Sequence, residues 1–269
     1  MYIIIMVNFC FLPILSRRQE RNWRSMRNLR LDICYEGTRY RGWQRLSNTS
    51  NTIQEKLEQA LSRILSEPID VSASGRTDAG THAMGQVVSF HCNSTMPCEE
   101  ILSQLRRYLP EDIGIYSCKN VSDRFHARLN AKTKTYVYRL WNSEQPCVFD
   151  RKFVYVDPRP LDVDSMQTAA NYFLGEHDFG AFCANKKIKK STVRYIHSIS
   201  IQRKGNELVF TVTGNGFLHH MVRIIVGTLL EVGRGERAAE SIPALFDGIR
   251  ADAGELIPAC GLCLWEVTY

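Results

Sequence analysis

An acid and a base lie two residues apart in the short segment Ser74–His82. Gly75 and Gly80 bracket Arg76 and Asp78, and glycines allow a tight loop that a ligand can approach closely. Because catalytic groups often lie on loops that a rigid scaffold positions, Asp78 and Arg76 are candidates for catalysis. The alternative is an ordinary turn, in which the Asp78 carboxylate accepts hydrogen bonds from nearby backbone amides.

Another charged residue lies in the apolar segment 217–232, FLHHMVRIIVGTLLEV, which predicts a buried helix. Arg223 lies in the middle of this segment, where a guanidinium needs an acid or hydrogen-bond acceptors unless it extends to solvent. Asp78 is a suitable partner, since contact with Arg223 would keep the carboxylate ionised. An ionised, oriented carboxylate is what nucleophilic catalysis by aspartate requires. A purely structural ion pair between these or other residues is the alternative.

The elements that must position these residues alternate between strands and helices. Apolar and polar residues alternate over 29–35, which indicates a half-buried strand. Thr52 and Glu55 form a capping box before a helix that ends near Ser66. Further strands are expected at 69–73, 86–91, 113–119, 135–141, 192–203, 207–213 and 262–268, and further helices at 97–108, 165–174, 217–232 and 240–246.

This order predicts an α+β protein with two α/β subdomains around mixed, mostly antiparallel sheets. We expect residues 26–125 to form an N-terminal subdomain that carries the catalytic loop. Residues 126–269 are expected to form a C-terminal subdomain that completes an active cleft between the two halves. The first 25 residues combine a short apolar run with a basic stretch and fit neither a membrane span nor a signal peptide. We expect the chain to start at Met26, with residues 1–25 a disordered tail or a mis-assigned start.

Charge and cysteine content give weaker information. The net charge is +6, but half of it comes from the first 25 residues, so bulk charge alone is weak support for nucleic-acid binding. Nine scattered cysteines fit a reducing cytosol, and the CxxC pair Cys260 and Cys263 lacks the second ligand pair of a structural zinc site. His219 and His220 lie in the predicted apolar helix and are expected to be core residues. No metal site is expected.

Several motifs appear together and in a fixed order. They are RGWQR (41–45), GRTDAG followed by THAMGQVVSF (75–90), FHAR (125–128), HDF (177–179), STVR (191–194), HHMVRIIVG (219–227) and GLCLWEV (261–267). This series resembles the tRNA pseudouridine synthase A family over about residues 28–269. A chance match to so many ordered motifs is far less probable than a match to RTDAG alone.

The resemblance implies specific roles for individual residues. Asp78 would be the nucleophile, Arg223 its partner, and Arg76 the residue that helps to displace the target base. Tyr136 would stack on the target uracil, although its strand pattern alone would favour an ordinary core tyrosine. The expected substrate contacts are Tyr136, Phe125, His126 and Arg128 on the base-flipping path, and Lys186, Lys187, Lys189 and Lys190 on tRNA. Without the resemblance, the four lysines would be interpreted as a solvated loop.

The resemblance also implies a pseudouridine synthase fold and the isomerisation of uridine to pseudouridine at positions 38–40 of the tRNA anticodon stem-loop. Such enzymes are cytoplasmic homodimers that flip the target base and need no cofactor or metal. Two alternatives remain open, the same chemistry on another RNA such as ribosomal RNA and a non-catalytic RNA-binding relative. The intact pair Arg76 and Asp78 argues against the second. An Asp-dependent hydrolase would be expected to show a second carboxylate.

Overall fold

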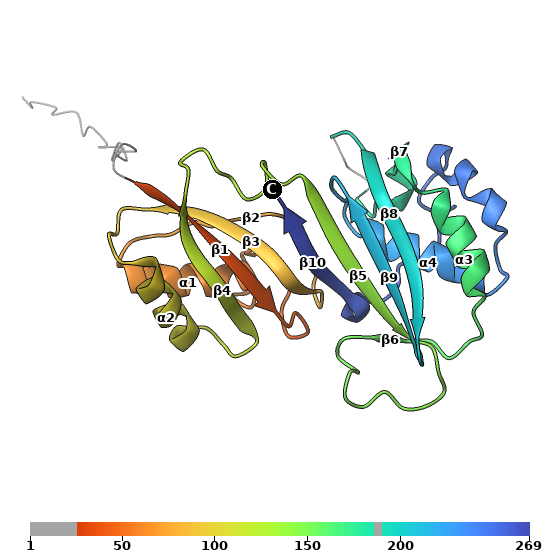
Figure 1. The fold of residues 1–269 in the computed structure, drawn as a ribbon, viewed down its shortest axis with the longest axis horizontal. Coiled ribbons are helices and arrows are strands. Elements are labelled where there is room, and N and C mark those ends of the chain that lie inside the picture. Colours follow the sequence, from red (N-terminus) through yellow and green to blue (C-terminus); the bar gives the residue numbers. More distant parts are fainter. Residues whose placement is uncertain (1–25, 186–189) are drawn as a thin grey trace, which may run out of the picture.

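The computed structural model describes residues 26–185 and 190–269. The expected tail at 1–25 and the predicted contacts Lys186, Lys187 and Lys189 lie outside the described residues. The described chain forms one continuous, mostly antiparallel ten-stranded sheet with helices packed against it, so the predicted α+β class is confirmed (Figure 1).

The strand order of the sheet is β4-β1-β3-β10-β5-β9-β8-β7, with β2 beside β3 and β6 beside β5. Neighbouring strands are antiparallel except at the pairs β10–β3 and β5–β6. The strands are β1 (Arg27–Tyr35), β2 (Ser72–Ala73), β3 (His82–Cys92), β4 (Ile113–Val121), β5 (Thr133–Trp141), β6 (Tyr155–Val156), β7 (Gly175–Asp178), β8 (Val193–Lys204), β9 (Glu207–Gly214) and β10 (Leu262–Thr268).

The helices cover the two ends of this sheet. Helix α2 packs on β4 and on α1, whereas α3 packs on β8 and on α4 (Figure 1). The helices are α1 (Ile53–Leu65), α2 (Cys98–Tyr108), α3 (Val163–Asn171) and α4 (Met221–Gly233), with 3₁₀ turns η1 (Gly180–Phe182), η2 (Ala239–Ser241), η3 (Pro243–Asp247) and η4 (Ala259–Gly261).

In helix α1, the start, the buried face and the end all follow from the local sequence. The Thr52 hydroxyl accepts a hydrogen bond from the Glu55 amide at 3.3 Å, as the capping-box pattern predicts. Ile53, Leu57 and Leu61 are buried, so the apolar face of the helix lies in the core. The helix ends at Ser66, whose left-handed conformation is a common helix C-terminus.

Other elements differ from the sequence prediction. Helix α4 begins at Met221 rather than at residue 217, because His220 before it has φ +65°, a left-handed conformation that a helix cannot continue. The predicted helix at 240–246 consists instead of the short 3₁₀ turns η2 and η3. The sequence pattern gave no sign of β7, which pairs with the end of β8.

The last strand in the sequence lies at the centre of the sheet. Strand β10 is antiparallel to β5, with Leu262 opposite Tyr138, and parallel to β3, with Cys263 opposite His82. It therefore connects β1–β4 of the N-terminal half with β5–β9 of the C-terminal half. One continuous apolar core runs through both halves.

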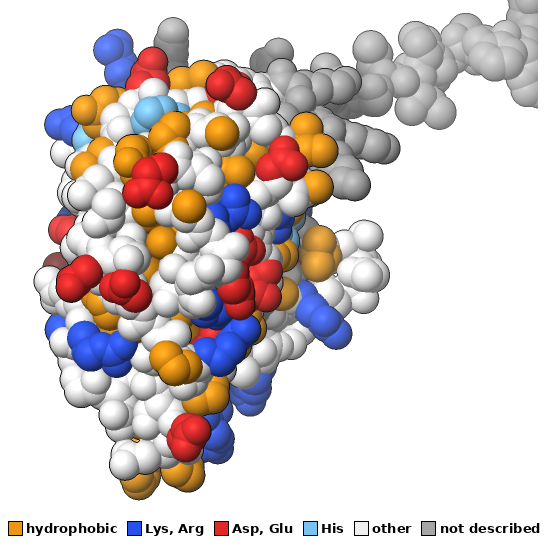
Figure 2. Space-filling model, turned by 90° about the vertical axis from the view of Figure 1, so that its right-hand side faces the viewer, with side chains coloured by type: hydrophobic (Ala, Val, Ile, Leu, Met, Phe, Trp, Pro, Cys, Tyr) orange, Lys and Arg blue, Asp and Glu red, His pale blue; other side chains and the backbone are white. Residues whose placement is uncertain are grey.

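The surface at the α3 end of the molecule carries basic and acidic side chains close together rather than an extended area of one charge (Figure 2). This face therefore gives no electrostatic signature of nucleic-acid binding. Among the described residues, no helix has the length and apolar character needed to cross a bilayer.

Candidate active site

The loop that carries Arg76 and Asp78 connects β2 to β3 and is fixed by side-chain hydrogen bonds on both sides. The Ser74 hydroxyl donates to Gln86 Oε1 at 2.6 Å, and Gln86 Nε2 donates to the Gly75 carbonyl at 2.9 Å. The Thr77 and Tyr35 hydroxyls lie 2.8 Å apart, and the Thr77 carbonyl accepts from the Trp43 amide at 3.0 Å. These hydrogen bonds hold the loop against β1, β3 and Trp43 rather than leaving it a free turn.

Asp78 contacts the C-terminal half of the molecule through Arg223. Nη1 of Arg223 donates to Oδ2 of Asp78 at 3.4 Å, and Nε of Arg223 donates to the Ile257 carbonyl at 2.7 Å. The Arg223 side chain is only 11% exposed. Two separate acceptors thus satisfy a nearly buried guanidinium, as the sequence argument required. Arg223 lies in the first turn of α4 and not in the middle of a longer helix.

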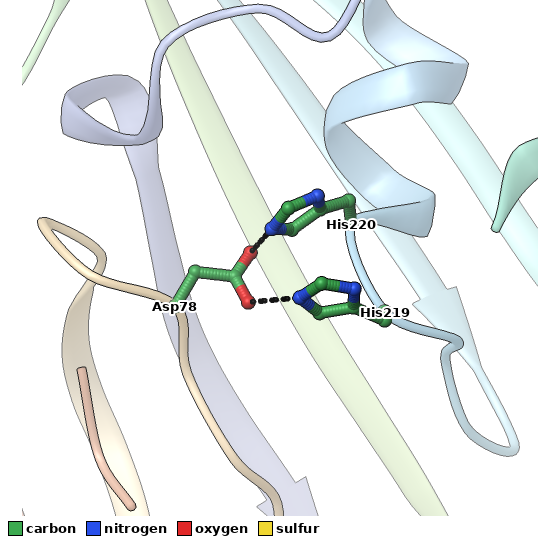
Figure 3. Close-up of side chains that lie close together, drawn as sticks. All are labelled: Asp78, His219 and His220. Carbon is green, nitrogen blue, oxygen red and sulfur yellow. Dashed lines mark ion pairs between the residues drawn. The ribbon is translucent and has the colours of Figure 1, made fainter. Parts of the chain in front are cut away.

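The two histidines before α4 also contact Asp78, and the prediction that they are core residues is wrong. Nε2 of His219 lies 3.7 Å from Oδ1 of Asp78, and Nε2 of His220 lies 3.4 Å from Oδ2 (Figure 3). The His219 side chain is 52% exposed. Because α4 starts only at Met221, both histidines lie in the turn that faces the loop carrying Asp78. Burial lowers the pKa of His220 below its ordinary value and outweighs the attraction of Asp78.

A cavity of about 1060 Å³ surrounds this cluster and is lined by both halves of the chain. Arg76 is exposed on its wall beside Asp78, so the structure brings the two loop candidates into the same cavity. Its lining includes Arg76, Thr77, Asp78, His126, Arg128, Lys134, Tyr136, Lys190, Arg194, Phe217, His219 and His220.

Tyr136 contributes an aromatic surface to the cavity. It lies on β5, and its ring meets Phe217 edge-on, with centroids 5.1 Å apart. Burial raises the pKa of the Tyr136 phenol, so the side chain stays neutral at physiological pH. Sequence reasoning missed Phe217, because its place in an apolar run gives no sign that the ring faces a cavity.

Several basic side chains line the cavity. Among the described residues, no carboxylate lies within 4.0 Å of Arg128, Lys134, Lys190 or Arg194. Nζ of Lys134 instead donates to the Ser74 carbonyl at 2.7 Å. Burial, together with repulsion from Arg128 and Arg194, lowers the pKa of Lys134 to about 8. Unpaired cations in a cavity are typical of an anion-binding surface.

The predicted segment 125–128 divides into two environments. His126 and Arg128 line the cavity, and their contact with substrate stays a prediction. Phe125 does not line it, because its ring packs on Tyr269 with centroids 5.1 Å apart, beneath the Arg30 guanidinium. The structure therefore gives Phe125 a packing role in the connection to the C-terminus. Of the four predicted lysines, Lys190 is described and lies on the cavity wall.

The family model described as tRNA pseudouridine synthase matches residues 33–130 and 169–269. A tRNA pseudouridine synthase A 2 of Bacillus cereus is 43% identical over 245 residues, which cover 91% of this chain and all of that protein. The chain belongs to the tRNA pseudouridine synthase family. It is therefore an enzyme, an isomerase of the pseudouridine synthase class.

Other members of the tRNA pseudouridine synthase family match over the same extent. The tRNA pseudouridine synthase A 2 of Clostridium perfringens and the tRNA pseudouridine synthase A of Acetivibrio thermocellus are each 44% identical over 245 residues, 91% of this chain and all of theirs. Among solved structures, the archaeal box H/ACA sRNP Nop10–Cbf5 complex matches 75% of this chain and 43% of that chain, with 12% identity and a TM-score of 0.34.

Proposed function

We propose that this enzyme isomerises uridine to pseudouridine at positions 38–40 of the tRNA anticodon stem-loop, with Asp78 as the nucleophile. The observation that carries the proposal is the position of the Asp78 carboxylate, which Arg223 contacts at 3.4 Å inside a cavity that basic side chains also line. A carboxylate that a guanidinium orients in this way is suited to attack an electrophilic carbon.

The reaction breaks the C1′–N1 bond, rotates the uracil and forms a C1′–C5 bond. The proton lost from C5 is balanced by the proton gained at N1, so the reaction needs no oxidant and no energy source. The carboxylate can act by attack on C1′, by attack on C6 or by proton removal from C2′. Each of these routes requires an ionised Asp78 that faces the nucleotide.

Access to those atoms requires the target nucleotide to leave its stack, which costs a few kcal/mol. Tyr136 and Phe217 supply aromatic rings at the cavity wall, and stacking of a base on one ring contributes ~1–3 kcal/mol. The exposed guanidinium of Arg76 would occupy the space that the flipped base leaves. Together these groups offset the cost of base flipping.

The basic residues in the cavity support tRNA as the substrate. Arg128, Lys134, Lys190 and Arg194 lack acid partners among the described residues and are suited to contact backbone phosphates. The halves 26–125 and 126–269 would close on the stem-loop from two sides, since both line the cavity. The enzyme would act as a homodimer in the cytoplasm.

Pseudouridine mapping of total RNA tests the proposal. Cells that lack this protein should lose pseudouridine at tRNA positions 38–40, and wild-type protein should restore it whereas Asp78→Asn should not. Loss of pseudouridine from ribosomal RNA alone would overturn the tRNA assignment. Sedimentation of the purified protein with and without tRNA tests the dimer, and a monomer in both conditions would contradict it.

A further inference from the structure

The cluster of Asp78, His219 and His220 brings three metal-ligating side chains to one point. One ligand atom from each lies within 4.8 Å of the other two. Imidazole nitrogens and a carboxylate oxygen form a donor set that suits divalent transition-metal ions, Zn²⁺ among them. The sequence spacing gave no sign of this set, because two of its members are adjacent in the chain and the third lies far away.

The distances between these groups do not correspond to good hydrogen bonds. His219 Nε2 lies 3.7 Å from one Asp78 oxygen and His220 Nε2 lies 3.4 Å from the other. Hydrogen bonds from N–H to O are typically about 2.7–3.2 Å long. Over the described part of the chain, the hydrogen bond that reaches the Asp78 carboxylate comes from Arg223 and not from an imidazole, and at 3.4 Å it is itself a long one.

The same distances correspond to ligands arranged around a metal ion. Zinc binds nitrogen and oxygen at about 2.0–2.2 Å, so two ligands of a tetrahedral ion lie about 3.3–3.6 Å apart. The His220 separation of 3.4 Å lies within this range and the His219 separation of 3.7 Å lies just beyond it. The two separations end on different oxygens of the Asp78 carboxylate, and the three ligand atoms lie within 4.8 Å of one another. An ion between the carboxylate and the two rings would therefore require only small side-chain movements.

The backbone before α4 places both imidazole rings, His219 and His220, on the side that faces Asp78. In a regular helix, consecutive side chains diverge by about 100°, but His220 has φ +65° and precedes the helix. The two rings stack as a result, with centroids 3.7 Å apart and planes inclined by 30°, and both present a nitrogen to Asp78 (Figure 3). The half-exposed His219 leaves a path for an ion from the cavity.

We propose that Asp78, His219 and His220 form a binding site for a divalent transition-metal ion of the Zn²⁺ type, with water as the fourth ligand. The isomerisation itself needs no metal, so this site would be inhibitory, because the ion would occupy the carboxylate. Arg76 and Arg223 lie nearby and repel a cation, so the affinity should be lower than that of a dedicated structural zinc site. The inhibitory effect, unlike the binding itself, rests on the proposed role of Asp78.

Zinc titration against a chelating indicator tests the binding directly, without any activity measurement. His219→Ala and Asp78→Asn should each weaken Zn²⁺ binding by more than about tenfold, since even indirect partners of a metal commonly contribute 10–100-fold. The matched control is the double variant Cys260→Ser/Cys263→Ser, which removes the competing thiols and should retain the affinity. Equal affinity in wild type and His219→Ala, or loss of binding in the cysteine variant, would overturn the site.

A separate activity measurement distinguishes the metal site from the proposed function. Wild-type turnover of tRNA should fall as Zn²⁺ fills the site, with a midpoint at the measured dissociation constant, and a chelator should restore it. If Zn²⁺ binds through these residues but turnover is unchanged, the metal site stands and the proposed role of Asp78 fails. Without specific binding, the metal site fails while the proposed function is unaffected.

Discussion

The Arg223 guanidinium bridges two parts of the molecule, donating from Nη1 to Asp78 Oδ2 at 3.4 Å and from Nε to the Ile257 carbonyl at 2.7 Å. The first contact connects α4 with the loop between β2 and β3, and the second connects α4 with the segment before β10. One side chain thus fixes the position of the carboxylate relative to both halves of the sheet.

Asp78→Asn keeps the shape of the side chain but removes its charge. Tritium release from tRNA labelled at uridine C5 should fall by at least about 10⁴-fold, as expected on loss of a nucleophile. Affinity for tRNA should change little, because the basic residues in the cavity are intact. The control is Asp112→Asn, which removes a carboxylate that pairs with Arg39 away from the cavity. Substantial turnover in Asp78→Asn would exclude the nucleophile assignment.

Arg223→Ala leaves the Ile257 carbonyl and the Asp78 carboxylate without their partner. The free energy of unfolding should fall by about 1–3 kcal/mol, the usual cost of a buried polar group without a hydrogen bond. Urea denaturation measures this change. Arg39→Ala is the matched control, because Arg39 is 66% exposed and its removal leaves Asp112 with the hydrogen bond from the Tyr40 hydroxyl, so the loss of stability should be smaller. Equal losses in the two variants would contradict the bridging role of Arg223.

The titration of Lys134 predicts a pH dependence of tRNA binding. Its pKa is lowered to about 8, so the ammonium loses its proton as the pH rises through 8 and attraction to phosphate declines. Affinity for tRNA should therefore fall between pH 7 and 9 in wild type, and Lys134→Met should flatten this slope. A fluorescence-anisotropy titration at constant ionic strength measures both. Identical slopes would show that Lys134 does not contact the RNA.

The lowered pKa of Lys134 also predicts that the stability of the fold rises with pH, whereas the affinity for tRNA falls. Between pH 8 and 10.5 the unfolded lysine binds more protons than the folded one, so the wild-type free energy of unfolding should rise with pH relative to Lys134→Met. This effect, measured without RNA, separates the titration of Lys134 from its proposed contact with phosphate.

Gly42→Ala should disturb the catalytic loop from outside it. Gly42 has φ +89°, and a Cβ there would lie 2.8 Å from the Thr77 carbonyl, one residue from Asp78. Gly205→Ala is the matched control, since Gly205 has φ +60° but nothing within 4 Å of its Cβ position. In both variants, alanine in the left-handed region should destabilise the fold by about 1–2 kcal/mol. Only Gly42→Ala should also lose turnover in the tritium-release assay, and unimpaired turnover would show that the loop tolerates displacement.

Local chemistry accounts for what could be predicted from the sequence. The cap at Thr52 and the alternating burial of β1 depend on neighbouring residues, so their patterns are visible in the chain. The contact between Asp78 and Arg223 could also be anticipated, because an arginine in an apolar run must find an acceptor.

Features that depend on backbone twist or on distant strands could not be predicted in this way. The left-handed conformation of His220 delays the start of helix α4 to Met221. It also turns His219 and His220, which were expected in the core, toward Asp78. The short β7 exists only because β8 supplies its partner. Phe125 was expected on the substrate path from motif position alone, but its environment is set by Tyr269, 144 residues further along the chain.

The central position of β10 has a consequence for synthesis of the protein. All the other strands of both halves precede β10 in the chain. Strands β3 and β5 are joined only when β10 is inserted between them. Because β10 follows all the other strands in the sequence, the two halves of the sheet can join through it only after all the other strands have been synthesised. A chain without β10 would lack the strand that joins β3 to β5, and its two halves would share no strand.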